Sequence, residues 1–179
     1  MRSIVISPHP DDEVLGAGGT LFKRNTIKKN SLYWIIVTRL NPSTPKKKIV
    51  RRNYEIKKIS AIFKFKKVFQ LNFITTELDN SSKKKLILNF SDIFNEIKPD
   101  ELFVPHFSDV HSDHKIVSEV ISSSTKNFRF PFIKKILAYE VLSETDYNLN
   151  RKQVFFPNYY EDITKFLTKK KKCYENIQI

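Results

Sequence analysis

The sequence gathers side chains that hold metals and move protons into two short segments. The first, residues 7–20 (SPHPDDEVLGAGGT), places three successive carboxylates shortly after His9, with a proline on each side of the histidine. Because proline restricts the backbone, this loop can project an imidazole and a carboxylate together as two ligands of a divalent metal. An alternative is that Asp11 or Asp12 caps a following helix by accepting hydrogen bonds from its free N–H groups.

The second segment, residues 105–114 (PHFSDVHSDH), holds the other three of the chain's four histidines, His106, His111 and His114. A histidine and an aspartate from the first segment, with one histidine from the second, would give three zinc ligands and leave one position open to water. That arrangement is typical of catalytic zinc sites, whereas structural sites use four ligands that commonly include cysteines. The chain has one cysteine, Cys173, so a cysteine-rich site is excluded.

Short apolar runs rich in β-branched and aromatic residues alternate with segments of helical spacing. We expect strands at residues 4–7, 32–38, 67–71, 101–105 and 135–139. We expect helices at residues 15–29, 50–65, 81–97 and 113–126. The alternation predicts an α/β fold, a three-layer Rossmann-like domain with a mainly parallel sheet and helices on both faces. Beyond residue 139 the pattern predicts an extended piece at 154–156, a turn at 157–158 and a last helix near 163–173.

Each polar segment follows a predicted strand and leads into a predicted helix. Because the carboxyl ends of parallel strands share one edge of the sheet, we expect the two loops to meet there. All three glycines lie between residues 16 and 19, but Leu21 stands where a dinucleotide fingerprint needs its third glycine. Glycine costs a helix interior about 1 kcal/mol relative to alanine, so the cluster predicts close approach of the backbone to the sheet or to a ligand.

Length, charge and cysteine usage bound the class of protein. A chain of 179 residues with 40% hydrophobic composition predicts one domain over residues 1–179. The net charge of +13 comes from lysines scattered along the chain, so we do not expect a nucleic-acid partner, although a basic surface would equally favour a phosphorylated or nucleotide-linked substrate. We expect the lysines at 169–172 to be solvated, with contact to an anionic membrane surface left open.

The predicted cellular compartment rests on cysteine usage and on the lack of recognisable targeting and membrane-spanning segments. The single cysteine fits a reducing compartment, and residues 1–6 read as neither a signal peptide nor a membrane anchor. No stretch approaches the roughly 20 apolar residues of a membrane span. We therefore expect a cytoplasmic protein, with homo-oligomer formation left open.

These segments resemble the PIG-L/LmbE-like family of zinc-dependent de-N-acetylases. The resemblance rests on PHPDDE at residues 8–13, LGAGGT at 15–20 and HSDH at 111–114. Arg52 followed by Glu55, YEVLSE at 139–144 and the segment 156–163 extend it over most of the chain.

The resemblance implies roles for individual residues. It implies that zinc is bound by His9, Asp12 and His114. It further implies that Asp11 is the general base, that His111 helps to stabilise or protonate the tetrahedral intermediate, and that Asp113 orients or tunes His111. Arg52 is a candidate to bind a substrate hydroxyl or phosphate, but an arginine three residues before a glutamate is just as readily an ordinary helix-surface pair.

The function predicted is hydrolysis of the acetamide of an N-acetylated sugar, giving a free amine and acetate. Nitrogen and oxygen ligands accept several divalent metals, so a metal other than zinc stays open. Two alternatives also stay open: hydrolysis of another amide, such as an amino-sugar thiol conjugate, and a non-catalytic basic binding protein that retains the fold.

Overall fold

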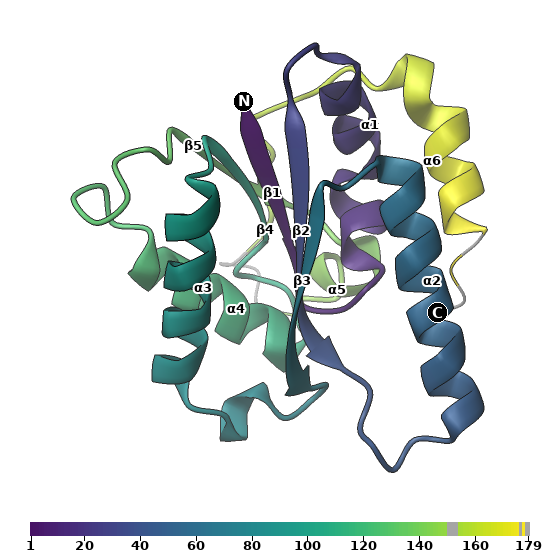
Figure 1. The fold of residues 1–179 in the computed structure, drawn as a ribbon, viewed down its shortest axis with the longest axis vertical. Coiled ribbons are helices and arrows are strands. Elements are labelled where there is room, and N and C mark those ends of the chain that lie inside the picture. The colour runs from purple at the N-terminus through teal and green to yellow at the C-terminus, as the bar shows by residue number, and fades with distance from the viewer. Residues whose placement is uncertain (150–153, 176, 178–179) are drawn as a thin grey trace.

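The computed structural model describes residues 1–149, 154–175 and 177, and its centre is a sheet of five parallel strands (Figure 1). The strand order is β3-β2-β1-β4-β5. The strands are β1 (Arg2–Ser7), β2 (Ser31–Arg39), β3 (Lys67–Ile74), β4 (Glu101–Pro105) and β5 (Lys135–Tyr139). Every neighbouring pair is parallel, so all five carboxyl ends lie at one edge.

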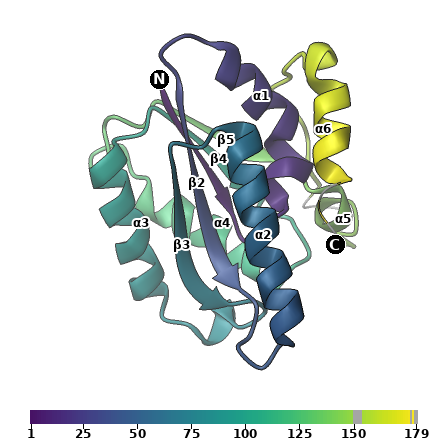
Figure 2. The ribbon, with the colours of Figure 1, turned by 45° about the vertical axis from the view of Figure 1, so that its right-hand side comes forward.

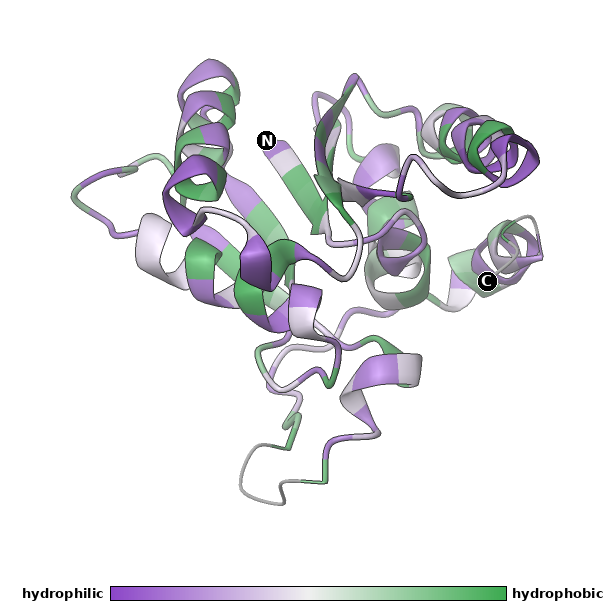
Figure 3. Cartoon of the chain, turned by 90° about the horizontal axis from the view of Figure 1, so that it is seen from below, coloured by the Kyte–Doolittle hydropathy of each residue, from purple (hydrophilic) through white to green (hydrophobic). Residues whose placement is uncertain are grey.

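Alternating side chains send each strand's apolar residues to both faces of the sheet. In β1, Ile4 and Ile6 join one core cluster while Val5 joins the other. Helices α3 (Lys83–Ile97) and α4 (Ser112–Ser124) cover the first face. Helices α1 (Gly18–Thr26), α2 (Lys46–Phe63) and α6 (Leu167–Tyr174) cover the second (Figures 1 and 2). Seen from below, onto the carboxyl ends of the strands, the helices carry both hydrophobic and hydrophilic stretches (Figure 3).

The predicted three-layer α/β fold is confirmed, and all five strands appear where the apolar runs predicted them. The main differences lie at element ends and after β5. Helix α2 begins at Lys46 rather than at residue 50, and the first helix opens with a π-helical turn, η1 (Glu13–Ala17). A short helix α5 (Leu142–Thr145) was not predicted, and residues 154–156, predicted as an extended piece, belong to no helix or strand. The 3-10 turns η2 (Leu78–Asn80) and η3 (Thr164–Phe166) complete the described elements.

The glycine cluster has the cause that its position predicted. A Cβ at Gly16 would lie 2.2 Å from the Tyr139 ring and 2.9 Å from the main-chain oxygen of Glu140. A Cβ at Gly19 would lie 2.4 Å from the side chain of Ile163. At Gly16 and Gly19 the backbone therefore packs directly against the end of β5 and the segment before η3, whereas a Cβ at Gly18 would make only ordinary contacts of 3.6 Å.

A buried guanidinium joins the segment before η3 to the sheet. Arg24 on α1 donates hydrogen bonds of 3.0 Å from Nε and Nη2 to the Glu101 carboxylate and another from Nη1 to Glu161. Ser3 also donates to Glu101. Because a buried charge is costly unless it is paired, these contacts fix the position of the segment that carries Glu161.

None of the described helices is long and apolar enough to span a membrane.

Candidate functional site

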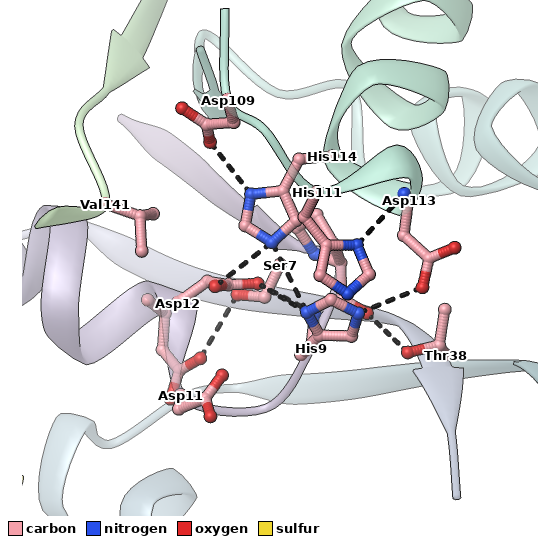
Figure 4. A network of polar contacts seen from close by, with 12 residues as sticks. Ser7, His9, Asp11, Asp12, Thr38, Asp109, His111, Asp113, His114 and Val141 are labelled. Carbon is pink, nitrogen blue, oxygen red and sulfur yellow. Dashed lines mark hydrogen bonds and ion pairs between the residues drawn. The ribbon is translucent and has the colours of Figure 1, made fainter. Parts of the chain in front are cut away.

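The two polar segments meet at the carboxyl edge of the sheet because their strands are neighbours. Strand β1 pairs directly with β4. His9 follows β1 and Asp12 stands at the start of η1, while His111 and His114 lie at the start of α4 after β4. Figure 4 shows the side chains of both segments pointing toward one another.

Three ligand atoms converge at this junction. Nε2 of His114 lies 3.3 Å from Nδ1 of His9 and 3.4 Å from a carboxylate oxygen of Asp12, and Nδ1 of His9 lies 3.8 Å from the other oxygen. Asp12 and His114 are buried, with 3% and 1% of their surface exposed. The three atoms fall within 4.8 Å of one another, which is the arrangement of a candidate metal site.

The outer ring nitrogens are held by two further carboxylates. Nε2 of His9 lies 3.0 Å from Asp113, and Nδ1 of His114 lies 2.8 Å from Asp109. Because an ionised carboxylate only accepts hydrogen bonds, each outer nitrogen carries the proton and each inner nitrogen keeps its lone pair. The lone pairs of the two inner nitrogens then face each other at 3.3 Å beside a carboxylate. A cation bound between them would offset their mutual repulsion.

The electrostatics of the cluster also favour positive charge. Burial raises the pKa of Asp12 to about 6, although His114 and His9 lower it in part. Burial alone would lower the pKa of His114, but Asp12 and Asp109 outweigh it and raise that pKa above its usual value. The residues therefore fit a divalent ion, and their nitrogen and oxygen donors suit zinc among several metals.

The Asp113 carboxylate is fixed by a loop from the neighbouring strand. Its oxygens accept hydrogen bonds from the main-chain N–H groups of Thr76, at 2.8 Å, and Leu78, at 3.4 Å. Burial alone would raise the pKa of Asp113, but the hydrogen bonds from His9 and Thr76 hold it below its usual value. The side chain therefore stays ionised and supports His9.

The expected partner of Asp113 needs a correction. The carboxylate hydrogen-bonds His9 and not His111, whose Nδ1 accepts from the main-chain N–H of Asp113 at 3.1 Å. Since that N–H can only donate, the proton of a neutral His111 lies on Nε2. Burial, with the nearby His9, lowers the pKa of His111 and favours this neutral ring.

Asp11 and Arg52 form the wall beside the cluster. Figure 4 shows Asp12 directed toward the histidine rings and Asp11 directed away from them. Nη1 of Arg52 donates to the Pro10 carbonyl at 2.7 Å and lies 3.6 Å from the Asp11 carboxylate. The cluster thus has the Asp12 carboxylate inside it and the Asp11 carboxylate at its edge.

These residues open onto a cavity of about 620 Å³. His9, Asp11, Asp12, His111, His114 and Arg52 all line it, but Asp113 does not. The volume lies within the range of small-molecule sites and exceeds what a bare metal site requires. The cavity can therefore take an organic substrate beside the cluster.

Two residues of the motifs lie away from the cavity. His106 is buried and its Nδ1 lies 2.5 Å from the Ser108 hydroxyl. Glu13 is fully buried, accepts a hydrogen bond from Ser7 at 3.1 Å, and has one oxygen without a partner among the described residues. Burial raises the pKa of Glu13 well above its usual value, which favours the neutral acid at this position beneath the loop.

Sequence reasoning missed the contributions of β3 and the loop after it. The main-chain donors of Thr76 and Leu78 leave no signal in residue type, because any residue but proline has an N–H. Arg39, Lys46 and Gln70 also line the cavity, and no motif marked them.

The three-layer fold and the His-Asp-His cluster at the carboxyl edge of the parallel sheet together describe an α/β protein with a candidate metal site. Residues 4–124 match the family model described as PIG-L, GlcNAc-PI de-N-acetylase. The chain therefore belongs to the PIG-L family, as its motifs predicted. It matches no curated protein sequence.

Solved structures share the fold at low sequence identity. An N,N'-diacetylchitobiose deacetylase from Pyrococcus horikoshii superposes with a TM-score of 0.75 at 23% identity, covering 98% of this chain and 68% of that one. A deacetylase in the biosynthesis pathway of teicoplanin gives 0.78 at 14% identity, covering 98% and 83%. A 4-carboxy-2-hydroxymuconate hydratase from Pseudomonas putida KT2440 gives 0.73 at 14%, covering 99% and 79%. Because the hydratase has the same fold, the reaction must be argued from the site.

Proposed function

We propose that this protein is a metal-dependent N-deacetylase, a single domain over residues 1–179 that releases acetate from an N-acetylated sugar. One observation carries the proposal: the lone pairs of His9 and His114 converge with the Asp12 carboxylate at the wall of a cavity that Asp11 also lines. Membership of the PIG-L family supports the reaction class. The single cysteine supports a cytoplasmic location.

His9, Asp12 and His114 would hold the metal, which we propose to be zinc. In such a site a zinc ion acts as a Lewis acid that polarises a carbonyl and lowers the pKa of water toward about 7. The second carboxylates, Asp113 and Asp109, keep the two imidazoles in the tautomers that leave their inner lone pairs free.

Asp11 is the proposed general base. Its carboxylate lies at the cavity wall, where it can take a proton from water that attacks the amide carbon. When the C–N bond breaks, Asp11 returns this proton to the leaving nitrogen, so that acetate and a free amine result. The Arg52 guanidinium lies 3.6 Å from the Asp11 carboxylate, and both side chains line the cavity.

His111 is proposed to stabilise the oxyanion. Its neutral ring presents Nε2–H while Nδ1 is occupied by the Asp113 main chain. A fixed donor aimed at the developing charge on the carbonyl oxygen lowers the barrier without reorganisation. We further propose that Arg52 binds a polar group of the substrate with the guanidinium nitrogens that do not contact Pro10.

The test is acetate release by zinc-loaded protein from a panel of free, nucleotide-linked and lipid-linked N-acetylamino sugars. The matched control is Asp11→Asn, which preserves shape but removes the base. We expect release from one substrate class and at least a 100-fold lower rate in the control, in line with general-base contributions of about 10²–10⁴-fold.

Two results would overturn the proposal. No acetate from any member of the panel, with protein shown to contain metal, would exclude this activity and leave another amide or a binding role. Full turnover by Asp11→Asn would exclude the assigned base, whatever the substrate.

A further inference from the structure

The cavity extends sideways from the histidine cluster, across the end of β2 to the edge of the sheet. The cluster lies where β1 meets β4, whereas β3 is the edge strand on the other side of β2. The remote part of the cavity is lined by Arg39 at the end of β2, Gln70 and Asn72 on β3, and Lys46, Ile49 and Asn53 on α2. A substrate placed with its amide at the cluster would therefore reach these residues with its other end.

Charges in the described cavity lining are divided between its two ends. The carboxylates that line it are Asp11 and Asp12, from the first polar segment, and Glu144 on α5. Arg39 and Lys46 lie at the remote end, where the lining contains no carboxylate. The cavity lining is thus polarised. Arg39 and Lys46 supply positive charge at the end that lacks carboxylates, away from the cluster where the amide would react.

Arg39 is positioned by an irregular feature of the sheet. Its Nε donates to the Asn72 carbonyl at 3.3 Å. Asn72 has a φ of 61°, in the left-handed region, and the register between β2 and β3 shifts between Ile36 and Thr38. This bulge turns the carbonyl toward Arg39, and the terminal guanidinium nitrogens stay available at the cavity mouth.

Neither cation has an ionic partner in the described part of the chain. The recorded ion pairs include Arg51, Arg52, Lys67 and Lys83, but not Arg39 or Lys46. A guanidinium and an ammonium group on one cavity wall match an oxyanion, to which arginine can donate two parallel hydrogen bonds.

We propose that Arg39 and Lys46 form a subsite for an anionic substituent, a phosphate or a carboxylate, that the amide substrate carries at the end remote from its acyl group. The inference rests on the proposed function for the placement of the amide. It narrows the substrate to acidic derivatives of the N-acetylated sugar and disfavours neutral ones.

The test measures binding rather than turnover. Glucosamine 6-phosphate carries its anion across the sugar ring from the amine and has no acetyl group to lose, so its affinity for zinc-loaded protein can be compared with that of glucosamine by calorimetric titration. We expect the phosphate to strengthen binding about tenfold or more at low salt. Arg39→Gln and Lys46→Gln should each weaken binding of the phosphate about fivefold, as exposed ion pairs do, and leave glucosamine unaffected. The preference should shrink as salt is added.

The control variant is Lys47→Gln, which removes the same charge from the next residue of α2, outside the cavity lining. Arg39→Lys should retain part of the preference. The 6-O-carboxymethyl ether of glucosamine replaces the phosphate by a carboxylate, and the stronger of the two ligands identifies the anion. An equal effect of Lys46→Gln and Lys47→Gln, or no measurable binding of either anionic ligand, would overturn the subsite.

The two proposals fail separately. Acetate release without any preference for anionic ligands removes the subsite and leaves the deacetylase. A preference that depends on Arg39 and Lys46, in a protein that releases no acetate, leaves the subsite and removes the reaction.

Discussion

Nε2 of His114 and Nδ1 of His9 face each other at 3.3 Å, although the residues are 105 positions apart in the chain. The pairing of β1 with β4 creates this relationship, because it brings the loops after the two strands to one place. In neutral rings the outer nitrogens, which contact Asp113 and Asp109, carry the protons, and the two facing nitrogens keep their lone pairs. The two facing nitrogens therefore suit joint coordination of one cation.

Removal of a proposed ligand should abolish metal binding. We expect His114→Ala and Asp12→Asn to lower zinc affinity by more than about 100-fold, the upper end of what loss of a supporting residue costs. Asp11→Asn should retain the metal, because the Asp11 side chain points away from the rings. Metal content after dialysis, measured by elemental analysis, checks this. Equal metal loss in all three variants would refute the division between ligand and base.

The carboxylates behind the ligands should tune the site without forming it. Asp113→Asn weakens the acceptor of the His9 Nε2 proton and should reduce zinc affinity by about 10–100-fold. Asp109→Asn should act similarly on His114. Competition with a chelator of known affinity measures both. Wild-type affinity in Asp113→Asn would show that its contact with His9 has no bearing on the metal.

Alanine substitution should change the free energy of unfolding in opposite directions at Gly16 and at Gly18. At Gly16 the new Cβ collides with Tyr139 and the Glu140 main chain, so overpacking should cost about 1–3 kcal/mol or more. At Gly18 its nearest neighbours lie 3.6 Å away, and alanine should stabilise the helix by up to about 1 kcal/mol. Urea unfolding of both variants gives the comparison. A stable Gly16→Ala protein would contradict the close packing.

Low pH should weaken the ion pair between Arg24 on α1 and Glu161 in the segment before η3. Burial alone would raise the pKa of Glu161, but hydrogen bonds from Lys23, Tyr159 and Arg24 lower it to about 2. Because the folded-state pKa lies below the usual 4.5, this contribution to the free energy of unfolding is present above about pH 4.5 and is lost as pH falls toward 2.

Glu161→Gln should therefore be less stable than wild type at pH 7 and approach it near pH 2, as measured by chemical denaturation at each pH. Glu119→Gln is the control, because its carboxylate side chain is 60% exposed. A stability difference for Glu161→Gln that does not change with pH would contradict the assignment.

The parts of the fold that residue type alone dictates were predictable. A strand buried on both faces needs an unbroken apolar run, and β1, β2 and β4 have one. Proline and glycine marked the loop that carries His9, and the shared edge of parallel strands predicted its meeting with His114. Helix α5 has four residues, too few for any periodicity to reveal.

Contacts made by main-chain atoms and by distant partners were not predictable. The direction of the Asp113 side chain depends on N–H groups of the loop after β3, which no side chain encodes. No pattern in the sequence marks Arg24 as a buried ion-pair residue, because its partner Glu101 lies 77 positions away. The cavity end at Arg39 likewise depends on a bulge between two strands, and only the register of the folded sheet shows it.

Trp34, the one tryptophan of the chain, donates its indole N–H to the Ser7 hydroxyl at 2.9 Å, and the same hydroxyl contacts Glu13. The fluorophore is fully buried beneath the loop that carries His9 and Asp12. Its emission depends on the local electric field, so a divalent charge arriving in that loop should shift its spectrum. Trp34 fluorescence should therefore report metal binding at the candidate site in unlabelled protein.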